Sequence, residues 1–412
     1  MSQSVLILGS VWPEPGSSAA GRRMMQLISL FQQEGWKIIF GTTAAESPHA
    51  ADLEGRGIRS LALSVNSSSF DDILHSLNPS MVLFDRFIME EQFGWRVAEQ
   101  CPDALRILDT EDLHCLRRAR GRAVKAGRPF RLQELLQDDS AKREVASILR
   151  CDLSLIISSF EMDLLQGMFG VDGALLHYLP FLLEPLDEDS QRRWPSFAER
   201  RHFVTIGNFR HPPNWDAVRY LKQDIWPLIR RRLPEEELHI YGAYPSQKVW
   251  QLHKPEEGFV IQGRAEDAAA VVRQARVSLA PLRFGAGLKG KLVEAMQCGT
   301  PSVTTTVGAE GMAGDLPWSG DIAEKKRDIA SAAVKLYTDR NVWQEAQQKG
   351  RDIINRRFTG DDFSERFIDR LRSIQKNMEA HRQSNFMGSL LMHHTAASTK
   401  YMSKWIEEKN RK

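Results

Sequence analysis

The sequence predicts an α/β protein built from two doubly wound domains. Short apolar runs alternate along the chain with segments of helical periodicity, which is the pattern of parallel strands covered on both faces by helices. This pattern restarts after a polar stretch near 182–197, so two domains of similar size are expected. The 412 residues, 42% of them hydrophobic and 26% charged, suffice to bury a core in each domain. We place the N-terminal domain at 1–187, the C-terminal domain at 188–375 and a tail at 376–412.

The N-terminal half opens with a strand, a helix and a second strand. The stretch VLILGSVWPEPGSSAAGRRMMQLISLFQQEGWKIIFGTT holds an apolar run, a loop rich in Gly, Ser and Pro, and apolar residues at helical spacing. Gly35 then ends the helix before the second apolar run. Further strands are predicted at 80–85, 104–110 and 153–159.

The C-terminal half repeats this alternation of strands and helices. Strands are predicted at 202–208, 238–244, 259–263, 277–282 and 301–306, with helices near 214–232, 266–275 and 288–298. Open α/β sheets bind ligands outside the carboxyl ends of their strands. A ligand site is therefore expected in the cleft between the two domains.

Composition excludes several classes of function. The net charge of +2 arises from 55 basic and 53 acidic residues, so no overall field marks the chain for nucleic acid. No segment reaches the roughly 18 apolar residues of a membrane span, and the N-terminus lacks the pattern of a signal peptide. Four cysteines without paired or metal-ligand spacing indicate reduced thiols in a cytoplasmic protein: Cys101, Cys115, Cys151 and Cys298.

The stretch RFGAGLKGKLVEAM resembles a phosphate-binding P-loop at first sight. Gly285, Gly290 and Lys291 follow the G-x-x-x-x-G-K frame, but Leu292 stands where a P-loop has the Ser or Thr that holds magnesium. The stretch also lies deep in the second half, whereas a P-loop normally follows the first strand of its domain. We interpret it instead as a strand, a glycine loop and a helix start, whose free N–H groups and helix dipole favour a phosphate.

Two kinds of side chain fit this phosphate site. Glu294 lies one turn beyond Gly290, where its carboxylate could accept two hydroxyls of a ribose. Lys289 or Lys291 could offset the charge of a diphosphate. The alternatives are that Glu294 is only a surface carboxylate and that Lys289 and Lys291 only belong to a solvated helix start. Together the residues predict a site for a nucleoside diphosphate presented through its ribose.

The sequence resembles a known family at these residues. The stretches TIGNFRHPPNWDAVRYL, LHIYGAY, VIQGRAED and LAPLRFGAGLKGKLVEAMQCGTPSVTTTVGAEGM are similar to the donor domain of GT-B glycosyltransferases of the family 4 type, the glycosyl transferases group 1. The resemblance covers roughly 4–372 and is strongest over 202–312. It implies a GT-B fold, in which two Rossmann-like domains face a central cleft.

The resemblance implies roles for the donor loop. Of two glutamates that family members commonly carry around the donor helix, Glu294 matches the second, which holds the ribose. The first, which contacts the transferred sugar, is replaced by Ala286. Backbone N–H groups of Gly285, Ala286 and Gly287, with Leu288 after them, remain available to the sugar and the phosphates.

The basic pair of the family is also altered. In the family an Arg and a Lys often grip the diphosphate from the first loop of the donor domain. Here this loop is GNFRHPPN, and the expected positions carry Asn208 and Pro213 or Asn214. Arg210 and Lys289 are the substitutes that we expect to bind the diphosphate.

In the first domain, DTEDLHCLR is similar to the motif that lies near the reacting sugar. A His often precedes the Asp of that motif, where this chain has Glu111 before Asp112 and places His114 two positions further on. Asp112 and His114 are both candidates to face the sugar, and a core or surface role of His114 is the alternative. PEPGSSAAG, which contains Gly16, is similar to the opening loop that borders the cleft, although it could be only a turn.

The resemblance implies a retaining, metal-independent, hexosyltransferase-like enzyme. It needs no cofactor, takes a nucleotide-diphosphate sugar as donor, and transfers the sugar to a glycan or lipid-linked glycan, as in cell-surface polysaccharide synthesis. No clustered Asp/His set and no D-x-D at a strand end indicates a metal site. Two alternatives stay open: a non-catalytic nucleotide-sugar-binding subunit, favoured by Ala286, and a nucleotide-sugar epimerase on the same architecture.

Two further features could contact a membrane from the cytoplasmic side. The run 117–131 contains seven basic residues, which could hold an acidic acceptor or an anionic membrane face, or form a solvated surface. The tail 376–412 has apolar clusters with lysines nearby, so a helix there could lie on a membrane or on a partner. Docking on the protein itself, or disorder, is the alternative for the tail.

Overall fold

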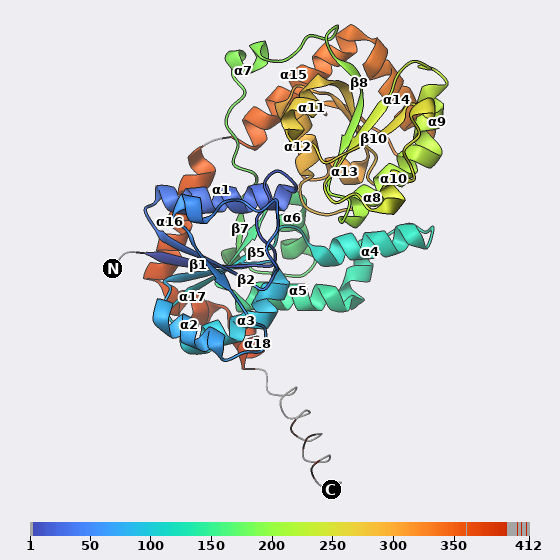
Figure 1. The fold of residues 1–412 in the computed structure, drawn as a ribbon. Coiled ribbons are helices and arrows are strands. Elements are labelled where there is room, and N and C mark those ends of the chain that lie inside the picture. Colours follow the sequence, from blue (N-terminus) through green and yellow to red (C-terminus); the bar gives the residue numbers. More distant parts are fainter. Residues whose placement is uncertain (1–2, 360, 394–401, 403–404, 406–408, 410–412) are drawn as a thin grey trace.

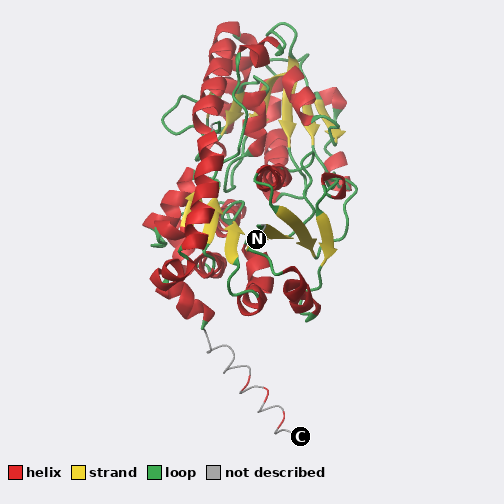
Figure 2. Ribbon diagram, turned by 90° about the vertical axis from the view of Figure 1, so that its left-hand side faces the viewer, coloured by secondary structure: helices red, strands yellow, loops and turns green. Residues whose placement is uncertain are grey.

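The computed structural model describes residues 3–359 and 361–393, and also residues 402, 405 and 409. The chain forms two lobes, each with one parallel sheet between helices (Figure 1). In the view turned by 90°, the strands of the two sheets lie in separate lobes (Figure 2). This α/β architecture of two doubly wound domains is the one that the sequence predicts.

The sheet of the N-terminal domain has seven strands in the order β3-β2-β1-β4-β5-β6-β7. Its strands are β1 (Ser4–Gly9), β2 (Lys37–Thr42), β3 (Arg59–Ala62), β4 (Met81–Asp85), β5 (Leu105–Asp109), β6 (Leu153–Ile156) and β7 (Leu176–Tyr178). The helices between them are α1 (Ala19–Gln33), α2 (Ser69–Leu77), α3 (Phe87–Gln100), α4 (His114–Lys125), α5 (Asp139–Arg150) and α6 (Ser159–Gly167).

The sheet of the C-terminal domain has six strands in the order β10-β9-β8-β11-β12-β13. They are β8 (Arg201–Ile206), β9 (Leu238–Tyr241), β10 (Phe259–Gly263), β11 (Ala275–Ala280), β12 (Ser302–Thr304) and β13 (Gly320–Ile322). The helices after the first domain are α7 (Glu188–Arg192), α8 (Pro212–Tyr220), α9 (Trp226–Arg230), α10 (Gln247–Trp250), α11 (Ala268–Gln274), α12 (Gly290–Gln297), α13 (Thr306–Ala309), α14 (Lys326–Thr338), α15 (Arg340–Arg357), α16 (Asp361–Lys376), α17 (Met378–Ser384) and α18 (Phe386–Met392).

The central strand β1 explains why the strands read as continuous apolar runs. Successive side chains of a strand point to opposite faces of the sheet. Leu6 and Leu8 lie in the apolar cluster on one face, and Val5 and Ile7 in the cluster on the other. Because helices cover both faces, every position of the strand must be apolar.

Three strands escaped the sequence-based prediction because they are short or lie at sheet edges. The edge strand β3 has no fully buried residue, and β13 is the polar sequence Gly-Asp-Ile at the other sheet's edge. The third, β7, has only three residues inside the Pro-interrupted run LLHYLPFLLEP. None of them shows a strand-length apolar run.

The sheet orders fix where a ligand can bind. In each sheet the chain reverses its direction of growth between two neighbouring strands, β1 and β4 in the first and β8 and β11 in the second. Crevices at the carboxyl ends of such strand pairs are the usual ligand sites of open α/β sheets. The loops that follow β1, β5 and β11 meet at the domain interface, as the contacts described below show.

Helix α16 lies with the N-terminal domain, although the sequence-based boundaries place it in the C-terminal one. Phe367, Ile368, Leu371 and Ile374 on its apolar face are buried in the same cluster as Phe31 of α1. In Figure 1 the red end of the chain runs along the lower lobe. The chain passes between the domains twice, near Leu183 and near Thr359, and a β-bridge pairs these two connecting segments. The chain therefore re-enters the first domain after α15.

The first part of the tail docks on the protein itself, one of the alternatives that the sequence left open. The Arg382 guanidinium binds both carboxylate oxygens of Asp152 at 2.8 Å, and the Asn385 side-chain amide donates to the Leu149 carbonyl at 2.7 Å. Most of the predicted tail after residue 393 lies outside the described residues. Among the helices that the structure does describe, none has the length and apolar character needed to span a membrane.

A buried ion pair in this fold yields a stability prediction. Arg23 of α1 is 1% exposed, and its guanidinium binds the Asp109 carboxylate at 3.0 Å and the Leu179 carbonyl at 2.7 Å. Replacing Arg23 by Met leaves Asp109 as a buried charge without its partner, so we expect Arg23→Met to lower the free energy of unfolding by about 3–5 kcal/mol. Chemical denaturation measures this loss.

The control removes an exposed ion pair on the same face of the molecule. Arg372, 57% exposed, pairs with Glu34 at 2.5 Å, so Arg372→Met should cost less than about 1 kcal/mol. Equal losses of unfolding free energy in the two variants would show that burial does not make the Arg23 ion pair more important for stability.

Candidate functional site

The glycine loop after β11 passes directly over the loop after β5 of the other domain. Gly287 has a φ of +61°, a left-handed conformation that side chains with a Cβ rarely adopt. A Cβ added at Gly287 would lie only 2.8 Å from the Cβ of Asp112. The glycine therefore allows a close approach between the predicted donor loop and the predicted sugar-facing residue.

Glu161, at the start of α6, joins these two loops. Its Oε1 accepts the backbone N–H of Gly287 at 2.8 Å and that of Leu113 at 3.1 Å. The side chain is fully buried, and burial together with the nearby charge of Asp112 raises the pKa of Glu161 to about 8. One carboxyl group thus holds a loop from each domain in register.

The Asp112 and His114 side chains lie next to each other at the end of β5. The His114 Nε2 is 3.4 Å from the Asp112 Oδ1, and the Arg117 guanidinium also contacts the Asp112 carboxylate. Burial lowers the pKa of His114 to about 4, although Asp112 acts in the opposite direction. Burial would raise the pKa of Asp112, but Arg117 and His114 outweigh it and lower that pKa. At neutral pH the site therefore presents a carboxylate beside a neutral imidazole.

The Glu294 carboxylate faces the interface from the second turn of α12. It is 6% exposed and forms an ion pair with Arg22 of α1, at 3.0 Å from Oε1 to Nη1. The sequence predicts a ribose contact for Glu294 but gives no sign of Arg22. A guanidinium of the first domain thus contacts the carboxylate for which the sequence predicts two ribose hydroxyls.

The first turns of α1 and α12 meet at the interface (Figure 1). A Cβ added to Gly290, the first residue of α12, would lie 2.5 Å from the Ala19 Cβ at the start of α1. The Ser18 side chain caps α1, whereas no side chain caps α12. Helix N-termini attract anions through free N–H groups and the helix dipole, so this meeting point suits a phosphate.

The two lysines of the donor loop point in different directions. The Lys289 Nζ donates to the Gly287 carbonyl at 2.7 Å, and burial lowers the Lys289 pKa to about 8 against the attraction of Glu310. The Lys291 Nζ donates to the Asn214 Oδ1 at 2.7 Å, and burial lowers the Lys291 pKa to about 7. Lys291, rather than Lys289, therefore contacts the loop where the family carries its basic pair.

Arg210 and Gly16 lie at the rim of this region. The Arg210 guanidinium stacks on the Tyr244 ring at 3.7 Å, and the Tyr244 hydroxyl donates to the Glu14 Oε1 of the first domain at 2.6 Å. A Cβ added at Gly16 would lie 3.2 Å from the Arg264 guanidinium. The loop of Gly16 thus contacts the second domain, whereas Arg210 is connected to the first domain through Tyr244.

Arg120 of α4 holds the donor loop from the first domain. Its guanidinium forms two hydrogen bonds to the Glu310 carboxylate, at 2.8 and 2.7 Å, and one to the Gly285 carbonyl at 2.9 Å. Ala286 follows within the same loop and packs into the apolar cluster of the first domain, while Leu288 packs in a separate cluster to which both domains contribute. The loop that carries most of the predicted donor-binding residues is therefore fixed from both sides.

The basic run 117–131 is largely paired within the protein. Four of its arginines form ion pairs with carboxylates: Arg117 with Asp112, Arg120 with Glu310, Arg122 with Asp138, and Arg128 with Glu134. Paired in this way, these arginines offer less positive charge to an acidic acceptor or a membrane than the sequence alone indicates.

Sequence reasoning missed the residues that join the domains. Glu161 is 126 positions from Gly287, Arg120 is 190 positions from Glu310, and Arg22 is 272 positions from Glu294. No spacing rule links residues so far apart. The one available signal was Glu310, which lies inside the stretch that resembles the family.

Comparisons with known proteins agree with this geometry. Residues 200–339, most of the C-terminal domain, match the family described as glycosyl transferases group 1. No curated protein sequence is significantly similar to the chain.

Solved structures similar to this one span both domains. Sucrose-phosphate synthase from Thermosynechococcus elongatus is 14% identical with a TM-score of 0.66, over 90% of this chain and 99% of that one. A glycosyltransferase from Rickettsia africae is 11% identical with a TM-score of 0.64, over 91% and 99%. Anabaena HepE, solved in complex with UDP-glucose, is 13% identical with a TM-score of 0.62, over 90% and 99%. The fold is therefore GT-B, as predicted.

The buried state of His114 yields a prediction about pH. In the folded protein His114 gains a proton only near pH 4, whereas the ordinary value of 6.5 applies once the chain unfolds. The unfolded state thus binds the extra proton first as pH falls, and stability is lost between pH 6.5 and 4. From pH 7 to 4.5 this amounts to about 2 kcal/mol in the wild type, and the loss should be absent in His114→Gln.

Urea unfolding at the two pH values measures the difference, because titrating groups that do not contact His114 are common to both proteins and cancel. His75→Gln removes an exposed histidine of α2 and should keep the wild-type loss. Parallel pH curves for wild type and His114→Gln would contradict the neutral state of His114.

Proposed function

We propose that the protein is a retaining glycosyltransferase, which moves a sugar from a nucleotide-diphosphate sugar to a hydroxyl of a glycan or lipid-linked glycan. One observation carries the proposal: at the carboxyl ends of both sheets the glycine loop of the second domain meets the Asp112 loop of the first, and Glu294 meets Arg22 of α1. The family match over 200–339, which contains the loop and Glu294, and the UDP-glucose bound by HepE support it.

The donor nucleotide binds to the second domain in this proposal. The Glu294 carboxylate accepts the two ribose hydroxyls in place of its ion pair with Arg22. The diphosphate lies at the uncapped start of α12, where N–H groups and the Lys291 amine offset its charge. A bound phosphate would raise the pKa of Lys291 from about 7, because a nearby anion favours the protonated amine. Arg210 and Lys289, expected from the sequence, are further candidates for contact.

The transferred sugar lies between the glycine loop and Asp112. The acceptor oxygen forms its bond to the sugar carbon on the face from which the diphosphate departs, and the departing phosphate oxygen takes the acceptor proton. The Asp112 carboxylate stabilises the positive charge that develops on the sugar ring, and the neutral His114 offers a hydrogen bond to a hydroxyl. These steps need positioning and charge neutralisation, which the chain's own residues supply without a metal ion.

The acceptor binds to the first domain, and the enzyme works on a growing cell-surface glycan in the cytoplasm, at the inner face of the membrane. Support for this part is indirect: all four cysteines are free and buried, as suits a reducing compartment. Ala286 at the place of the family's first glutamate favours the non-catalytic alternative, because no side chain of the loop reaches the sugar hydroxyls from that position.

Ligand-induced stabilisation tests the donor site. UDP-, GDP-, ADP- and dTDP-sugars are added without metal, and the shift of the unfolding midpoint is measured. A donor at about 100 times its dissociation constant should stabilise the wild type by about 2.7 kcal/mol. We expect one nucleotide class to do so, and Glu294→Ala to lose the effect because the ribose contact is removed.

Arg22→Ala is the matched control. It breaks the same ion pair but leaves the Glu294 carboxylate in place, so the donor should still stabilise this variant. Stabilisation that survives in Glu294→Ala and disappears in Arg22→Ala would refute the ribose role.

Turnover separates transfer from binding. With the donor that the screen identifies, release of the nucleoside diphosphate is measured with and without a glycan acceptor. Asp112→Asn should lower kcat by about 10²–10³ while leaving donor-induced stabilisation intact, because it removes charge stabilisation of the transition state only.

Asp163→Asn, which alters an exposed carboxylate on α6, should keep wild-type turnover. Product formed from donor alone would indicate the epimerase, and donor binding without any turnover would indicate the non-catalytic subunit.

A further inference from the structure

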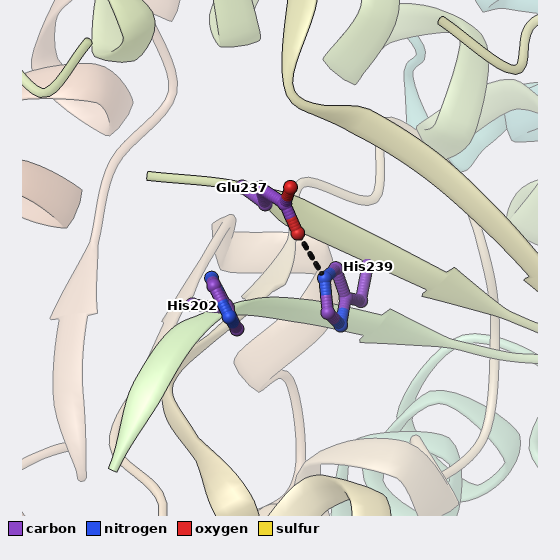
Figure 3. Close-up of side chains that lie close together, drawn as sticks. All are labelled: His202, Glu237 and His239. Atoms are coloured by element: carbon purple, nitrogen blue, oxygen red, sulfur yellow. Dashed lines mark hydrogen bonds and ion pairs between the residues drawn. The ribbon is translucent and has the colours of Figure 1, made fainter. Parts of the chain in front are cut away.

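A cluster of two histidines and a glutamate lies at the amino ends of β8 and β9. The glycine loop lies on the other side of the sheet, where the strands have their carboxyl ends. His202 is the second residue of β8, His239 is the second residue of β9, and Glu237 directly precedes β9. The two strands are parallel neighbours, with Val204 opposite His239. Figure 3 shows the three side chains gathered on one side of these strands.

The ligand-type atoms of the cluster converge. One nitrogen of each imidazole and one carboxylate oxygen lie within 4.8 Å of one another. The His239 Nε2 is 2.7 Å from the Glu237 Oε2, and the two imidazole rings stack with centroids 4.6 Å apart. Each of the three side chains is partly exposed, so an ion and a completing water molecule can reach them.

The backbone conformation and the neighbours of His202 hold its side chain in place, which a pair of ordinary surface histidines would not require. Its backbone has a φ of +61°, which is rare for a residue with a side chain and costs energy. The His202 N–H donates to the Tyr337 hydroxyl at 3.0 Å, and that hydroxyl in turn donates to the Glu236 carboxylate. A second carboxylate, that of Glu236, lies 4.0 Å from the His202 Nδ1.

The His202 Nδ1 itself is a polar atom without a partner. It is shielded from solvent and forms no hydrogen bond to any residue that the structure describes. Buried polar atoms of this kind are rare and call for an explanation, such as a bound ion or water.

We propose that His202, Glu237 and His239 bind a divalent transition-metal ion such as Zn²⁺. Two imidazoles and one carboxylate, with an open position for water, are a common zinc ligand set. Imidazole selects Zn²⁺, Ni²⁺ or Cu²⁺ over Mg²⁺ and Ca²⁺, and the Glu236 and Glu237 carboxylates balance the charge of the ion. Zinc bonds of about 2.0–2.2 Å place ligand atoms about 3.5 Å apart. The His239 and Glu237 atoms must therefore separate from 2.7 Å, and any more distant pair must close, movements that partly exposed side chains permit.

The position of the cluster assigns the ion a structural role. Donor and sugar residues lie at the carboxyl ends of the strands, whereas this cluster joins the amino ends of β8 and β9 next to Tyr337 of α14. A bound ion would hold these three elements together without touching the proposed reaction. The site is thus independent of the proposed glycosyl transfer.

Titration of the metal-free chain with zinc chloride tests the proposal. After chelation and desalting, isothermal titration calorimetry and elemental analysis should show one Zn²⁺ per chain in the wild type. His202→Ala and His239→Ala should each weaken binding at least about tenfold, since each removes a direct ligand. His75→Ala, which removes an exposed histidine of the other domain, should bind as the wild type does.

A readout without a variant guards against misfolding. Co²⁺ added to the wild type should give the visible absorption of a site with nitrogen and oxygen ligands, and Zn²⁺ should abolish it by competition. Magnesium chloride should give no comparable binding. Zinc affinity unchanged in both histidine variants, or a wild type that binds no Zn²⁺ and gives no Co²⁺ spectrum, would overturn the proposal.

Discussion

The shared hydrogen bonds of Glu161 are the constraint on which the proposed site depends. One buried carboxyl oxygen accepts an N–H group from the glycine loop of the second domain and one from the Asp112 loop of the first. Separating the two loops would break the hydrogen bonds of the Gly287 and Leu113 N–H groups to this carboxyl oxygen. The close approach of Gly287 to Asp112 follows from this single interaction.

Charged contacts also cross the interface. Arg120 holds Glu310 and the Gly285 carbonyl, while Arg22 holds Glu294. The first contact fixes the shape of the donor loop, and the second occupies the carboxylate to which we assign the ribose. If a donor binds as proposed, it exchanges this ion pair between domains for hydrogen bonds to the ligand.

The two edges of the second sheet differ in chemistry for a topological reason. All its strands are parallel, so all their carboxyl ends lie on the side that faces the first domain and all their amino ends lie on the opposite side. The glycine loop and Glu294 come after the carboxyl end of β11. His202 and His239 lie at the amino ends of the strands, away from the proposed donor site, where the proposed ion joins two neighbouring strands.

The sequence by itself determined the two α/β domains, because strands buried on both faces must be apolar throughout, as in β1. It also predicted a phosphate-binding glycine loop with Glu294 after it, since glycines before a helix and a carboxylate in its second turn are local patterns. Only the tertiary structure decided that α16 returns to the first domain, that Lys291 rather than Lys289 meets the loop after β8, and that Glu161 joins the domains. These depend on contacts between residues far apart in the chain, and such contacts leave no periodicity or spacing in the sequence.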